Sequence, residues 1–140
     1  MKASKRTVWI FMGSKSDEEI MSICEETLKS KAVPFKKFIH SAHREPDRIR
    51  ELIKQAEKEK VVAIIAAAGL AAHLPGFIAS QTEIPVLGVP LPSSTLGGLD
   101  SLLSIVQMPG GVPVATFGIG KPGAKNAALF AARLYRSGKF

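Results

Sequence analysis

The chain has 140 residues and a formal net charge of +7, from 19 Lys and Arg against 12 Asp and Glu. This length predicts a single domain, residues 1–140, and argues against a separate cofactor module. Hydrophobic residues make up 46% of the chain, which excludes general disorder, and no apolar run reaches the roughly 18 residues that a membrane span needs. The positive charge favours anionic partners, either phosphorylated metabolites or nucleic acid.

The first half of the chain alternates between strand and helix patterns. In chain order we expect a strand at Thr7–Met12, a helix from Asp17, a strand at Phe35–Ile39, a loop at His40–Glu45 and a helix from Pro46. The helices are expected because apolar residues recur every three or four positions, which places them on one face.

The second half continues the alternation. We expect a strand at Val61–Ala66, a short helix before Gln81, a strand at Pro85–Pro90, a helix within Gly97–Gln107, a strand at Val112–Phe117 and a helix at Asn126–Arg136. The continuous apolar run at Val61–Ala66 is typical of a strand buried on both faces. The sequence therefore predicts an α/β sandwich with a central parallel sheet covered by helices.

Cys24 is the single cysteine, so the chain can form no internal disulfide and has no cysteine cluster for zinc. This usage is typical of a reducing, cytoplasmic compartment. We expect Cys24 to be a small core residue of the first helix.

Three segments that follow the first three strands carry the residues suited to chemistry. The loop Gly13–Asp17 offers a glycine, the hydroxyls of Ser14 and Ser16, and Asp17 ahead of a helix, a combination that can hold a phosphate or ribose. The alternative is that Ser16 or Asp17 only caps the helix.

The second segment, Ser41-Ala-His43-Arg44, joins a group that titrates near neutral pH to a guanidinium fork suited to phosphate. The third, 68–76, combines Gly69 and other small residues with His73, and small residues let the backbone approach a flat ligand. Either histidine can instead be structural. Because ligands collect at the carboxyl ends of parallel strands, we expect all three segments at one site.

Several reaction classes lack their motifs. His40 and His43 have no Cys, Asp or Glu at metal-ligand spacing, so we expect no metal site. The chain also has no Walker loop, no GxGxxG after the first strand and no GxSxG elbow, which argues against nucleotide triphosphate hydrolysis, dinucleotide redox chemistry and α/β-hydrolase chemistry.

The segments GSKSD, SAHREPD, AGLAAHLPG, PVLGVP, SIVQMP and NAALFAA occur in this order along the chain. Together they resemble the N5-carboxyaminoimidazole ribonucleotide mutase family of purine biosynthesis, also known as the catalytic subunit of phosphoribosylaminoimidazole carboxylase. The resemblance runs from about Val8 to Leu134. GLAAHLPG and SIVQMP are similar to the bacterial mutase branch.

The resemblance implies a flavodoxin-like α/β/α protomer in a homo-octamer, with no metal and no organic cofactor. It implies that Ser14, Asp17 and Arg44 bind the nucleotide, with Ser16 and Ser41 as neighbours. His43 matches the catalytic histidine and His73 the second histidine of the glycine-rich loop. The implied reaction releases carbon dioxide from a carbamate, traps it and transfers it to ring carbon C4, with a histidine moving the proton.

Four residues depart from the family pattern. Glu45 stands where Thr is usual, and its carboxylate is expected either to compete for phosphate beside Arg44 or to pair with a neighbouring charge. Ala67 and Leu70 replace glycines, and Phe77 replaces Met, each enlarging a side chain near the expected carbon dioxide pocket.

Two alternatives stay open. The same fold is compatible with direct carboxylation of aminoimidazole ribonucleotide by carbon dioxide. The positive charge is compatible with a non-catalytic nucleotide-binding or nucleic-acid-binding module, although such surfaces usually add exposed aromatic residues. We expect neither nucleic acid nor membrane as a partner.

Overall fold

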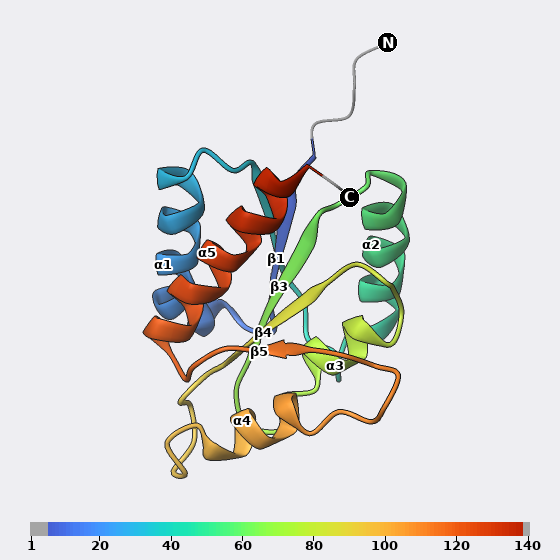
Figure 1. The fold of residues 1–140 in the computed structure, drawn as a ribbon. Helices are drawn as coiled ribbons and strands as arrows, with labels where there is room; N and C mark the ends of the chain where they lie inside the picture. The colour runs from blue at the N-terminus through green and yellow to red at the C-terminus, as the bar shows by residue number, and fades with distance from the viewer. Residues whose placement is uncertain (1–5, 139–140) are drawn as a thin grey trace.

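The computed structural model describes residues 6–138. Five parallel strands form one sheet in the order β2-β1-β3-β4-β5, the flavodoxin-like order (Figure 1). The strands are β1 (Val8–Met12), β2 (Phe35–Ile39), β3 (Ala63–Ala68), β4 (Val86–Pro90) and β5 (Ala115–Thr116). The expected α/β/α architecture is confirmed.

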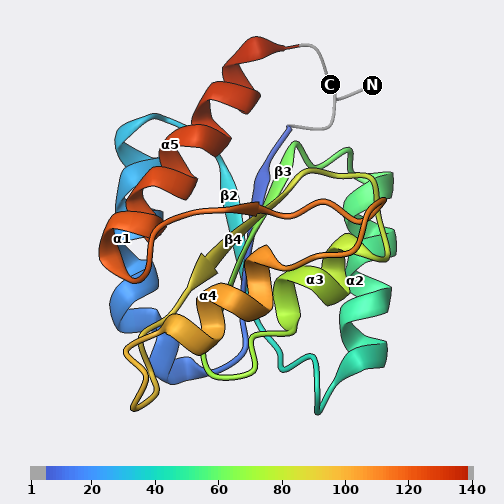
Figure 2. The same ribbon diagram turned by 60° about the horizontal axis from the view of Figure 1, so that its bottom comes forward.

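Helices cover both faces of this sheet (Figures 1 and 2). The helices are α1 (Glu18–Ser30), preceded by a short 3-10 turn at Lys15–Asp17, α2 (Pro46–Lys58), α3 (Leu74–Ala79), α4 (Leu99–Val106) and α5 (Lys121–Ser137). Helices α1 and α5 pack on one face, and α2, α3 and α4 contribute apolar side chains to the other. No helix in the described part of the chain is long and apolar enough to cross a membrane.

The central strands divide their side chains between these two cores. In β1, Val8, Ile10 and Met12 face the α1 and α5 side, whereas Trp9 and Phe11 face the other. All five are fully buried, as the alternation of side chains along a strand requires when both faces are covered.

The bounds of β3, β5 and α5 differ most from those expected from the sequence. β3 spans Ala63–Ala68 rather than Val61–Ala66. Its last residues are alanines with weak strand propensity, and they are extended because they pair with β1 and β4. β5 contains only Ala115–Thr116. α5 begins at Lys121 rather than Asn126, since Pro122 suits the first turn of a helix and Gly123 packs directly against the Gly118 carbonyl.

Cys24 is fully buried among the side chains between α1 and the sheet, as expected. Burial raises the pKa of its thiol to about 12, which keeps the sulfur protonated at neutral pH.

Candidate functional site

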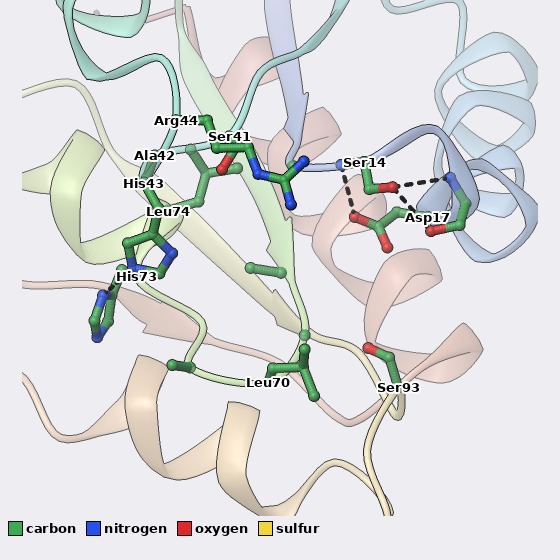
Figure 3. A pocket seen from close by; sticks show the side chains of 15 residues that line it. Ser14, Asp17, Ser41, Ala42, His43, Arg44, Leu70, His73, Leu74 and Ser93 are labelled. Carbon is green, nitrogen blue, oxygen red and sulfur yellow. Dashed lines mark hydrogen bonds between the residues drawn. The ribbon is translucent and has the colours of Figure 1, made fainter.

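The carboxyl ends of β1, β2 and β3 place three loops around one cavity of about 410 Å³ (Figure 3). This is the point where strand order reverses, because the chain leaves β1 toward β2 on one side and continues through β3 on the other. The eight residues selected from the sequence all line it: Ser14, Ser16, Asp17, Ser41, His43, Arg44, Gly69 and His73.

The loop after β1 is held by its own side chains. Ser14 is the N-cap of the 3-10 turn, its hydroxyl accepts a hydrogen bond from the Ser16 amide at 3.3 Å, and its amide donates to the Asp17 carboxylate at 3.2 Å. Asp17 occupies the N-cap position of α1 without a side-chain capping hydrogen bond, and Ser16 caps neither element, so the interpretation that Ser16 or Asp17 only caps the helix is not what the structure shows. The Ser14 and Ser16 hydroxyls lie 3.0 Å apart on the exposed side.

Burial raises the pKa of the Asp17 carboxyl, and backbone hydrogen bonds from Ser14 and Gly13 oppose this effect. The carboxylate lies at the same end of the cavity as Ser14, and the Arg44 guanidinium extends toward that end (Figure 3). This end of the cavity therefore combines hydroxyl, carboxylate and guanidinium groups, which can bind phosphate and sugar hydroxyls.

The two histidines meet at the other end of the cavity, although 30 residues separate them. His43 Nε2 and His73 Nδ1 are 2.5 Å apart, and the rings are inclined at 76°. A hydrogen bond between two ring nitrogens needs one donor and one acceptor, so only one of the facing nitrogens carries a proton. The pair can therefore pass a proton between its members.

The loop after β3 supplies small and apolar groups between these ends. A Cβ on Gly69 would lie 1.8 Å from the Ser93 Oγ and 3.1 Å from the Ser93 Cβ, so a larger residue here would force the Ser93 side chain to move. Leu70 adopts a left-handed backbone with φ of 56°, and the residue is 56% exposed.

Ser93, in the loop after β4, also lines the cavity and was not selected from the sequence. The buried Ser101 hydroxyl lies 2.8 Å from the Leu91 carbonyl oxygen and 2.9 Å from that of Gly98, which fixes both ends of the loop. The position of Ser93 directly after a buried strand was the only signal that could have indicated it.

Of the four departures from the family pattern, only Leu70 lines the cavity. Ala67 is buried in the core on the α1 and α5 side, and Phe77 packs beneath the Arg50 guanidinium, whose carbon lies 5.2 Å from the ring centroid. Ala67 and Phe77 therefore do not line the cavity themselves, although Ala68 and Leu74 near them along the chain do. Glu45 pairs with His40 at 3.1 Å rather than with Arg44.

Comparison with known proteins decides the family. The family model for AIR carboxylase matches residues 7–139. The chain belongs to the AIR carboxylase family. It is 56% identical over 127 residues to N5-carboxyaminoimidazole ribonucleotide mutase of Saccharolobus solfataricus, covering 91% of this chain and 79% of the relative. The Pyrococcus horikoshii protein of the same name is 54% identical, covering 96% and 75%.

A solved structure agrees with this placement in the AIR carboxylase family. The crystal structure of Treponema denticola PurE superposes with a TM-score of 0.85 at 28% sequence identity, covering 96% of this chain and 82% of that one. The similarity therefore extends over nearly the whole chain.

Proposed function

We propose that this member of the AIR carboxylase family is an N5-carboxyaminoimidazole ribonucleotide mutase. It would interconvert N5-carboxyaminoimidazole ribonucleotide and 4-carboxy-5-aminoimidazole ribonucleotide in purine biosynthesis. The observation that carries this proposal is the single cavity that joins a phosphate-binding end to a pair of histidines. Two relatives that are 56% and 54% identical bear the mutase name.

The polar end of the cavity binds the ribonucleotide. Arg44 donates a planar pair of N–H groups to the 5′-phosphate, and the Ser14 hydroxyl donates beside it. Asp17 accepts from sugar hydroxyls, since a carboxylate is unsuited to contact with phosphate. Ser16 and Ser41 lie beside this anchor and complete its polar lining.

The chemical steps take place at the histidine end. When the carbamate C–N bond breaks, its electron pair stays on the exocyclic nitrogen, which takes a proton from His43, and carbon dioxide is released inside the cavity. C4 of the ring then attacks carbon dioxide to form the new C–C bond. The tetrahedral C4 returns its proton to His43, which restores the aromatic ring and the initial state of the enzyme.

His73 supports this exchange, because its Nδ1 faces His43 Nε2 and can share the proton while His43 changes charge. The small and apolar side chains of the β3 loop, Ala68, Leu70 and Ala71, border the same space. They exclude water, which would otherwise compete for the trapped carbon dioxide.

A second candidate is direct carboxylation of aminoimidazole ribonucleotide, which the name of the matching family supports. The two reactions share the nucleotide and the new C–C bond but differ in the source of the carboxyl group. The sequence segments similar to the mutase branch favour the first reaction.

We also propose that the protein is a cytoplasmic homo-octamer, as the family resemblance implies. The single, buried Cys24 is consistent with a reducing compartment. Leu99, Leu103 and Val106 of α4 are each about half exposed, and Leu96 is 63% exposed. Contiguous apolar groups of this kind are typical of surfaces that bind another subunit. Light scattering after gel filtration gives the assembly mass, and a monomer would contradict the octamer.

The reaction is tested by supplying each substrate to the purified protein, with and without bicarbonate. The mutase proposal predicts turnover of N5-carboxyaminoimidazole ribonucleotide that does not depend on added bicarbonate. If only aminoimidazole ribonucleotide with bicarbonate is converted, the second candidate is correct. If neither substrate is converted, both are wrong.

A further inference from the structure

The loop that carries His43 and Arg44 is bridged by a side-chain contact. His40 Nδ1 lies 3.1 Å from Glu45 Oε2, and these two residues stand at either end of the segment 41–44. Neither His40 nor Glu45 lines the cavity, although the four residues between them in the sequence do.

Both ends of the bridge are anchored to regular structure. The His40 amide donates to the carbonyl of Met12, the last residue of β1, at 2.9 Å. Glu45 is the N-cap of α2, and its carbonyl accepts from the Ile49 amide at 3.2 Å. The bridge therefore connects the end of the sheet to the start of a helix, across the turn at 42–44. A backbone hydrogen bond from the Glu45 amide to the Ser41 carbonyl, at 2.8 Å, closes the same turn.

Helix capping does not explain the Glu45 carboxylate. Although Glu45 occupies the N-cap position, its side chain makes no capping hydrogen bond and extends back to His40 instead. It does not pair with Arg44, whose guanidinium extends toward Ser14 (Figure 3). The contact does not require a charged His40 either, because a neutral ring protonated at Nδ1 can also donate to a carboxylate.

We propose that His40 and Glu45 are positioning residues that hold the turn at 42–44, so that His43 faces His73 and Arg44 faces the phosphate-binding end. This role rests on the proposed function, since it acts through His43 and Arg44 on their substrate. The side chain of His40 is 22% exposed and that of Glu45 is 49% exposed, so solvent screens the pair. An exposed pair of this kind should change kcat/KM about two- to fivefold rather than by orders of magnitude.

The test uses Glu45→Thr, Glu45→Gln, His40→Ala and the double variant His40→Ala/Glu45→Thr. Threonine can cap α2 and so keeps the helix start, whereas glutamine keeps an oxygen that accepts from His40. Glu51→Gln is the matched control, because Glu51 lies on the same helix in an exposed pair with Arg48.

We expect Glu45→Thr and His40→Ala each to lower kcat/KM about two- to fivefold, and the double variant to lower it no further. Glu45→Gln should retain most of the wild-type kcat/KM. Thermal unfolding should stay close to that of the Glu51→Gln control. Unchanged kinetics in Glu45→Thr, or losses that multiply in the double variant, would overturn the proposal.

A readout that needs no turnover separates this proposal from the proposed function. Nitrogen-15 spectra of the histidine rings report on His43 directly. The His43 signals should shift or broaden in Glu45→Thr and keep their positions in Glu51→Gln. If the wild-type protein is inactive but these shifts appear, the proposed function is wrong and the positioning contact is real. If the His43 signals do not respond, the positioning proposal is wrong.

Discussion

At Leu70 we expect glycine to give a more stable protein than alanine, the reverse of the usual order within a helix. Its φ of 56° is left-handed, a conformation that costs an L-residue about 1–2 kcal/mol and glycine almost nothing. About 0.4–1 kcal/mol of this advantage of glycine is lost, because an unfolded chain with glycine has more conformational freedom than one with alanine. Leu70→Gly should therefore be more stable than Leu70→Ala by about 1 kcal/mol. The loss of leucine packing cancels, since both variants remove it.

Urea unfolding at one protein concentration measures this difference, with the fluorescence of the buried Trp9 as the signal. Lys54, which is exposed in the middle of α2, provides the control pair. Lys54→Ala should be more stable than Lys54→Gly by about 1 kcal/mol, the usual preference for alanine over glycine within a helix. If Leu70→Ala is more stable than Leu70→Gly, the strain argued for this loop does not exist.

The same substitution tests how the loop retains carbon dioxide. Leu70→Gly removes an apolar side chain from the cavity border and frees the backbone, so more carbon dioxide should escape before C4 attacks it. The ratio of released aminoimidazole ribonucleotide to carboxylated product should rise. An unchanged ratio would contradict a sealing role for Leu70.

Three further outcomes follow from the structure. Arg44→Ala should weaken nucleotide binding by about 2–3 kcal/mol in calorimetry and leave affinity for the dephosphorylated nucleoside unchanged; equal losses for both would show that Arg44 does not contact phosphate. Burial raises the pKa of the Asp17 carboxyl above 3.8, so the folded state binds this proton more tightly than the unfolded state does. The stability of the wild-type protein, relative to Asp17→Asn, should therefore fall as the pH rises through the window just above 3.8. Urea unfolding across that window would show no such trend if the carboxyl were not desolvated. Cys24, with its pKa raised to about 12, should react with an aromatic disulfide reagent at pH 8 only after unfolding, and rapid labelling of the native protein would contradict its burial.

The sequence predicts the order of elements well, because buried strands read as continuous apolar runs and the helices keep one apolar face. The sequence also indicates which residues gather at the cavity, because polar and small residues follow each of the first three strands, whose carboxyl ends lie at one edge of the sheet. The start of α5 was placed too late, because glycines near Gly120 indicate a loop while Pro122 in fact begins the helix.

Features that depend on tertiary contact were beyond reach of the sequence. The pairing of His43 with His73 arises only when two loops 30 residues apart meet above the sheet. Ser93 carries no motif, and its place depends on the close approach of Gly69. The contact of Glu45 with His40 depends on how the loop folds, and the sequence did not indicate His40 as the partner.

His43→Asn provides the most direct measurement of the central claim, that His43 moves the proton at ring carbon C4. Calorimetry should show the nucleotide bound with nearly wild-type affinity, because Arg44 and Ser14 are unchanged. The absorbance assay should show turnover reduced by roughly 10² to 10⁴, the range for loss of a general acid and base. Turnover near the wild-type rate would contradict the claim and transfer the role to His73, whereas loss of binding would make His43 a binding residue instead.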